Sequence, residues 1–145
     1  MGKKTKGRKR HIVTDTDGNL LALITHTADI QDRDDAPGVI DQARESYPTL
    51  VHMFADGGYS GSKLGGALKE TDGPSIEIVK RPPGVTGFVV VARRWVVERT
   101  FAWLGRCRRL AKDWETSIAS ADAWVLIAAI RRSARYIARK TAVEF

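Results

Sequence analysis

The sequence has a single cysteine, Cys107, among its 145 residues, and it has no long apolar segment. One cysteine excludes an internal disulfide framework and suits a reducing compartment. The longest apolar run, residues 123–130, is far shorter than the roughly 20 residues that a membrane-spanning helix requires. The basic start, MGKKTKGRKR, leads into HIVTDTDG and not into the apolar region of a signal peptide. We therefore expect a soluble, cytoplasmic protein with one domain.

Acidic residues are absent from the first ten positions, which hold six lysines and arginines. Residues 11–50 carry eight acids against two cations, whereas residues 91–145 hold twelve cations against five acids. The net charge of +7 is thus concentrated in a basic arm, residues 1–10, and in the C-terminal third. Two basic regions indicate a polyanionic partner such as nucleic acid, and a solvated surface with a basic tail is the alternative.

Several segments have the apolar alternation and the turn residues that are typical of β-structure. The hairpin is predicted because Asp17-Gly18 is a strong turn dipeptide between two apolar runs. The next strand is short and stops at Asp56, where a glycine-rich turn follows. The predicted β-segments are residues 10–26 (the hairpin), 49–55, 75–81 and, briefly, 88–91.

The predicted helices are residues 34–47, 62–70, 93–112 and 121–140. The first has Asp34 or Asp35 as its cap and Pro37 in its first turn, whereas two internal glycines weaken the second. Ser120 is placed to cap the last helix. A hairpin followed by alternating strands and helices predicts an α/β domain in which helices pack on one mixed sheet.

Glu98 is a carboxylate among apolar residues in the third predicted helix. Arg94 and Phe101, four and three positions away, share its face, and the apolar stripe of Val97 and Leu104 adjoins it. A carboxylate at the edge of a buried face is costly unless it is paired or bound to a metal ion. An ion pair with Arg94 and a metal site are therefore the two interpretations.

Asp56 is the second candidate, because it ends an apolar strand at the sheet edge where α/β proteins place functional side chains. A local role as a turn or cap residue is the alternative. Together, Asp56 and Glu98 could converge on a divalent-metal site, since Mg²⁺ and Mn²⁺ prefer oxygen ligands. Two such ions, about 3.5–4 Å apart, serve phosphodiester chemistry.

Two rows of cations on the last two predicted helices could follow a phosphate backbone. They are Arg108, Arg109 and Lys112 on the third helix, and Arg132, Arg135 and Arg139 on the fourth. A solvated helix face explains each row equally well when the carboxylates are disregarded. The three histidines are too scattered for a zinc site, and we expect structural roles for them.

Three stretches resemble the C-terminal part of bacterial insertion-sequence transposases of the DDE superfamily, in the insertion-sequence-five branch. They are GKKTKGRKRHIVTDTDGNLLA, ADGGYSG and RRWVVERTFAWLGRCRRLAKDWE, and the last contains the most specific motif. The resemblance implies an RNase-H-like fold, a mixed sheet flanked by helices. It also implies three carboxylates that hold two Mg²⁺ or Mn²⁺ ions, which cut duplex DNA at transposon ends and join it to target DNA.

By this resemblance, Asp56 corresponds to the second metal-binding acid and Glu98 to the third. Arg94 matches the arginine of the signature around the glutamate, and Val91 stands where that signature usually has tyrosine. The resemblance extends the DNA contacts to the basic arm and the cations around Glu98. The expected DNA-binding residues are Lys4, Lys6, Arg8, Lys9, Arg10, Arg94, Arg108, Arg109 and Lys112.

The first catalytic aspartate of the family lies upstream of the basic arm, and we expect it to be absent here together with its strand. Asp15 and Asp17 are poor substitutes, because both belong to the predicted hairpin turn. We therefore expect an N-terminally truncated catalytic domain, residues 11–145, that is inactive alone. An upstream transposase half or a homo-oligomer would be its partner, in the cytoplasm and associated with the nucleoid.

Two other functions are compatible with parts of the sequence. A non-catalytic DNA-binding fragment could modulate intact transposase, and it would bind DNA in a salt-sensitive way without metal-dependent cleavage. A small basic RNA-binding or ribosomal protein would explain the charge, but not the positions of Asp56 and Glu98. A DDE transposase is the leading prediction.

Overall fold

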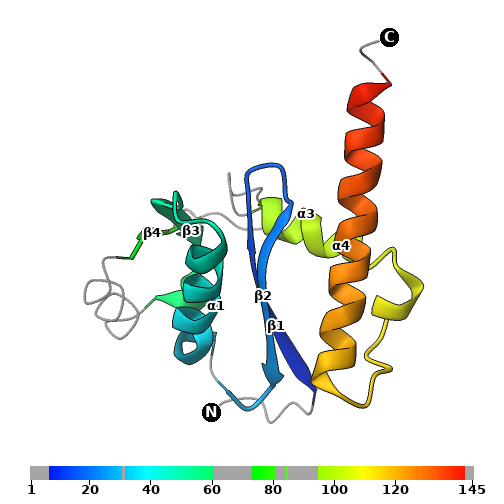
Figure 1. The fold of residues 1–145 in the computed structure, drawn as a ribbon. Coiled ribbons are helices and arrows are strands. Elements are labelled where there is room, and N and C mark those ends of the chain that lie inside the picture. Colours follow the sequence, from blue (N-terminus) through cyan, green and yellow to red (C-terminus); the bar gives the residue numbers. More distant parts are fainter. Residues whose placement is uncertain (1–6, 31, 61–72, 81–83, 85–94, 143–145) are drawn as a thin grey trace.

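The computed structural model describes residues 7–30, 32–60, 73–80, 84 and 95–142 of the chain (Figure 1). These residues form a mixed α/β structure with two small sheets and three helices. The last helix extends beyond the rest of the molecule at its C-terminal end (Figure 1). Within the described residues, no helix is long and apolar enough to cross a membrane.

A β-hairpin forms the middle of the molecule, and its position confirms the prediction from the sequence. Strands β1 (Arg8–Thr14) and β2 (Leu20–Thr27) pair antiparallel on either side of the Asp-Gly turn. The Asp15 carboxylate accepts a hydrogen bond of 2.9 Å from the backbone N–H of Asp17. Gly18 has a φ of +81°, which favours glycine, so the turn depends on both residue types.

Helix α1 (Asp32–Ser46) follows the hairpin and packs against it. The predicted cap at Asp34 or Asp35 is wrong, because the helix already includes both of these residues. Pro37 is therefore the sixth residue of the helix and lies outside the first turn. At that position proline removes one intrahelical hydrogen bond, so the packing of α1 outweighs a local cost.

Strands β3 (His52–Ala55) and β4 (Ser75–Ile78) form a second, parallel sheet. Both were predicted from the sequence, and β3 ends directly before Asp56 as expected. The predicted single mixed sheet is not observed, because the two strand pairs in the described residues share no hydrogen-bonded neighbour. The predicted helix at 62–70 and the extended piece at 88–91 lie outside the described residues.

Helix α3 (Trp95–Leu104) is shorter than the predicted helix 93–112. The helix ends at Leu104, just before Gly105, and the N–H of Cys107 donates a hydrogen bond of 2.9 Å to the Leu104 carbonyl. A short 3₁₀ turn, η2 (Arg108–Leu110), follows. Glycine is among the poorest helix formers, and this one coincides with the observed end.

Helix α4 (Ile118–Thr141) is the longest helix, and its cap differs from the prediction. Ser117 caps the helix by accepting a hydrogen bond of 3.1 Å from the N–H of Ser120. Ser120, the predicted cap, is thus the donor in this bond and belongs to the first turn. The sequence Ser-x-x-Ser offers two candidates, and the choice between them depends on where the preceding loop ends.

The hairpin buries both of its faces, because alternate side chains of a strand point to opposite sides. On one side, Val13 and Ala22 pack with Val39 of α1 in a core cluster that also reaches β3 and β4. On the other side, Leu23 packs with Leu104 of α3 and with α4 in a second cluster. The hairpin is therefore a middle layer, with α1 on one side and α3 and α4 on the other (Figure 1).

Candidate functional site

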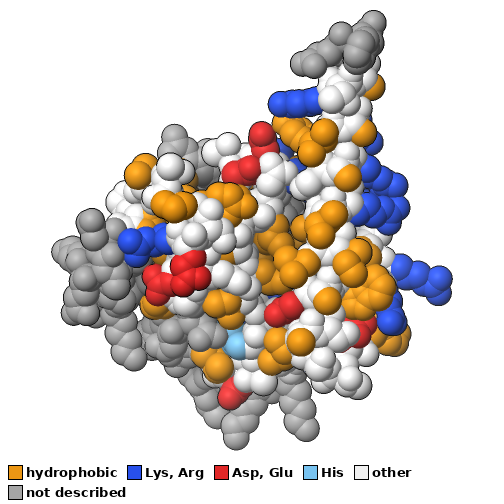
Figure 2. Space-filling model, viewed as in Figure 1, with side chains coloured by type: hydrophobic (Ala, Val, Ile, Leu, Met, Phe, Trp, Pro, Cys, Tyr) orange, Lys and Arg blue, Asp and Glu red, His pale blue; other side chains and the backbone are white. Residues whose placement is uncertain are grey.

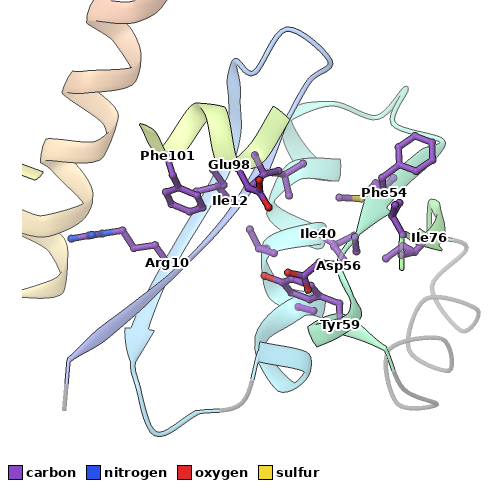
Figure 3. A pocket seen from close by; sticks show the side chains of 16 residues that line it. Arg10, Ile12, Ile40, Phe54, Asp56, Tyr59, Ile76, Glu98 and Phe101 are labelled. Atoms are coloured by element: carbon purple, nitrogen blue, oxygen red, sulfur yellow. The ribbon is translucent and has the colours of Figure 1, made fainter. Parts of the chain in front are cut away.

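A cavity of about 370 Å³ lies between β1, α1, β3 and α3. Its walls are mainly apolar, with Ile12, Ile40 and Phe101 among the lining residues (Figure 3). Asp56 and Glu98 also line this cavity, although they are 42 positions apart in the sequence. The fold thus brings the two carboxylates that the sequence singled out to the wall of one cavity, which we call the carboxylate cavity.

Asp56 has a local structural role at the end of β3. Its Oδ1 atom accepts a hydrogen bond of 2.8 Å from the N–H of Gly58, which caps the 3₁₀ turn η1 (Gly57–Tyr59). Within the described residues, Oδ2 makes no hydrogen bond. The cap and the metal-ligand interpretations are therefore compatible, because one oxygen holds the turn and the other remains for a ligand.

Glu98 lies in the first turn of α3 and its side chain is exposed at the cavity. The residues that α3 buries are Thr100 and Leu104, so the expected burial cost for Glu98 is wrong. An exposed carboxylate carries little of this cost, and a negative charge in the first turn of a helix is favourable. Arg94, the expected ion-pair partner, lies outside the described residues.

The cavity offers part of a metal-ligand set. In the described residues, no three His, Cys, Asp or Glu side chains are grouped closely enough to hold a metal ion. Asp15 and Asp17 do not line the cavity, and Asp15 instead holds the hairpin turn, as the sequence indicated. The two oxygen donors that are present, Asp56 and Glu98, suit Mg²⁺ or Mn²⁺, and phosphate oxygens are common additional ligands of these ions.

The described part of the basic arm is bonded to the protein itself. Arg8 donates a hydrogen bond of 2.8 Å to Asp113 Oδ1 and further bonds to two backbone carbonyls just before α4. Lys9 donates to a backbone carbonyl at 2.6 Å. Arg10 lines the carboxylate cavity, but its guanidinium extends away from the two acids, to 3.9 Å from Asp113 Oδ1 (Figure 3). Lys4 and Lys6 lie outside the described residues.

Arg108, Arg109 and Lys112 lie around a different, open groove of about 560 Å³ beside Trp114. The expected row along one helix face is wrong, because α3 ends before these residues. Arg109 is 3.6 Å from Glu115 Oε1, and the Lys112 ammonium lies 5.6 Å from the centre of the Trp114 ring. The three cations are thus close to one another, but none of them lines the carboxylate cavity.

Two of the three histidines form a buried pair that the sequence analysis did not identify. His11 and His26 stack with their Nε2 atoms 2.6 Å apart, and His11 Nδ1 lies 2.5 Å from the Tyr59 hydroxyl. Antiparallel pairing puts the two residues diagonally on one face of the hairpin, so working out the register from the Asp-Gly turn would have found this pair. The contacts tie the hairpin to η1, which follows Asp56 directly, and they agree with the structural role expected for the histidines.

The chain belongs to a family of transposases, because the family described as Transposase DDE domain matches residues 1–131. Enzymes of this family are nucleotidyl transferases that generally use divalent metal ions. Over 111 residues the chain is 33% identical to a protein of Burkholderia cepacia named "Putative transposase for insertion sequence element IS402". The alignment covers 72% of this chain and 52% of that protein, so the chain spans about half the length of this relative. No solved structure matches the chain significantly.

Proposed function

We propose that this chain supplies two metal-binding carboxylates, Asp56 and Glu98, to a DDE transposase that cleaves DNA at transposon ends and transfers strands into target DNA. The observation that carries the proposal is the convergence of these two acids on one cavity. The family match makes a metal site for phosphodiester chemistry the natural use of such a pair. The cofactor is Mg²⁺ or Mn²⁺, with two ions in the complete site.

The chain corresponds in this proposal to the C-terminal catalytic part of an enzyme in the insertion-sequence-five branch. Residues 1–10 are the basic arm and residues 11–145 belong to an RNase-H-like domain. The sequence motifs around both acids support this assignment, and so does the position of Asp56 at the end of a parallel strand. In this proposal a third acid, which is not among the described residues that line the cavity, completes the metal site.

The residues of the cavity indicate how each carboxylate would act. The N–H of Gly58 fixes Oδ1 of Asp56 and leaves Oδ2 to hold an ion. Glu98 is held on α3, and apolar side chains line much of the cavity around the two acids. When bound, the metal ions would activate the attacking oxygen and stabilise the leaving oxygen of the phosphodiester.

Replacing Glu98 by glutamine in the complete transposase tests the proposal. Glu98→Gln should abolish Mg²⁺-dependent cleavage of transposon-end DNA, because an amide keeps the size of the side chain but lacks the anionic ligand. DNA binding should remain nearly unchanged. Glu77→Gln is the matched control, because Glu77 is exposed on β4 and does not line the cavity. Full cleavage by the Glu98→Gln enzyme would contradict the proposal.

A non-catalytic role as a DNA-binding modulator of intact transposase is the second candidate. The groups of cations outside the carboxylate cavity favour it, because they need no metal site to hold DNA. A complete protein with salt-sensitive DNA binding and no metal-dependent cleavage would support this role over the first.

A further inference from the structure

A second cleft, of about 480 Å³, lies between the hairpin turn, α3 and α4. We call it the arginine cleft, because six arginines line it and Asp17 is the one acid among its described lining residues. None of its lining residues is shared with the carboxylate cavity. The six are Arg99, Arg106, Arg131, Arg132, Arg135 and Arg139.

Two of these arginines are fixed in place by the protein. Arg132 donates hydrogen bonds of 2.8 Å to Asn19 Oδ1 and 2.7 Å to the Asp17 carbonyl. Its guanidinium lies 4.0 Å from the centre of the Trp103 ring, and that of Arg99 lies 4.6 Å from the same centre. Burial lowers the pKa of Arg132, and the nearby charge of Arg99 lowers it further. These two residues and Trp103 form a rigid, positively charged floor.

The other four arginines of the cleft are not held in this way. Arg106, Arg131, Arg135 and Arg139 are exposed, and none of them makes an ion pair within the described residues. Three of them recur at every fourth position of α4, which separates their Cα atoms by about 6 Å along the helix axis. Like charges at this spacing destabilise a helix. An anionic ligand would remove the repulsion.

The rest of α4 shows that this charge is localised. Lys and Arg side chains gather along one side of the helix, and hydrophobic side chains run along another (Figure 2). Arg131 and Arg135 line the cleft, whereas Ile127 and Ile130 are exposed and do not line it. The cations are therefore concentrated beside the arginine cleft and are not spread evenly around the helix.

We propose that the arginine cleft binds the phosphate backbone of duplex DNA, at a place separate from the carboxylate cavity. Arginine suits phosphate because its planar group donates two parallel hydrogen bonds. Contacts to the backbone position a protein without reading bases, so binding here should be independent of sequence. The identification of the polyanion as DNA rests on the proposed function, whereas the affinity for a polyanion rests on the cleft alone.

Cys107 reports directly on the occupancy of the cleft. It lines the cleft, and it is the only cysteine of the chain. The rate of its alkylation by a maleimide should fall several-fold when the chain is saturated with a short DNA duplex in EDTA. An unchanged rate with bound DNA would place the DNA elsewhere and overturn the proposal, as would a failure to bind duplex DNA.

A charge-matched pair of variants gives a second readout. Arg135→Gln should reduce the slope of log affinity against log salt concentration by about 0.9, the value for one phosphate contact. Lys80→Gln removes the same charge at an exposed position outside the cleft, and it should leave the slope unchanged. Equal effects of the two substitutions would overturn the proposal, because only net charge would then matter.

The metal site and the arginine cleft can be tested separately. Glu98→Gln should leave the protection of Cys107 by DNA intact, because Glu98 belongs to the carboxylate cavity. Loss of metal-dependent cleavage with preserved protection would support both assignments. Protection without any cleavage by the complete, unsubstituted enzyme would support the arginine cleft alone and reject the metal site.

Discussion

Asp56 combines two roles that a single residue can perform because a carboxylate has two oxygens. Oδ1 caps η1 through the Gly58 N–H, and Oδ2 accepts no hydrogen bond within the described residues. The sequence indicated both a local role and a metal role for this position without separating them. The structure shows the capping role directly. The metal-binding role is a proposal, and substitutions of Asp56 can separate it from the capping role.

Asp56→Asn should change the free energy of unfolding little, because an asparagine oxygen can accept the same hydrogen bond. Asp56→Ala should lose the cap and destabilise the protein by about 1 kcal/mol. Urea unfolding of the two variants measures this difference. Both substitutions remove the charge, so both should weaken Mn²⁺ binding alike. Equal stability of the two variants would contradict the capping role.

At the scale of elements, the hairpin turn meets α3 closely. Thr100 Oγ1 donates a hydrogen bond of 3.1 Å to the Gly18 carbonyl, and Thr100 is 2% exposed. A Cβ atom on Gly18 would lie 2.6 Å from that hydroxyl oxygen. The Asp-Gly dipeptide therefore serves a tertiary contact in addition to the turn.

Gly18→Ala should destabilise the protein by about 1–3 kcal/mol, because alanine is strained at a positive φ and would collide with Thr100. Gly57→Ala is the matched control, since no atom lies within 4 Å of a Cβ at that position. Thermal unfolding compares the two variants. If Gly57→Ala lost as much thermal stability as Gly18→Ala, this result would contradict the described packing of the turn on α3.

Local signals in the sequence predicted local structure well. The Asp-Gly turn and the end of β3 at Asp56 depend on residues next to one another, and both are observed. The separation of the two sheets depends on distant packing and was not predicted. The early end of α3 and the start of α1 were also not predicted, although Gly105 was a local signal for the first. The convergence of Asp56 and Glu98 came from chemical reasoning about residue types, whereas the arginine cleft needed the structure to bring the hairpin turn, α3 and α4 together.

At the scale of the whole molecule, α3 connects two surfaces with different chemistry. Glu98 lines the carboxylate cavity, and its neighbour Arg99 lines the arginine cleft. The hairpin separates the two core clusters and contributes residues to both surfaces. A DNA duplex in the arginine cleft and a metal ion in the carboxylate cavity would therefore both contact α3, through the neighbouring residues Arg99 and Glu98.

Metal binding by the chain itself tests the central claim most directly. Substoichiometric Mn²⁺ should broaden the NMR amide signals around Asp56 and Glu98 before all others, since paramagnetic broadening falls steeply with distance. Asp56→Asn or Glu98→Gln should remove this effect, whereas Glu77→Gln should preserve it. Mn²⁺ broadening that is uniform across the chain, or that persists at the same residues in the Glu98→Gln variant, would contradict a metal site shared by these two carboxylates.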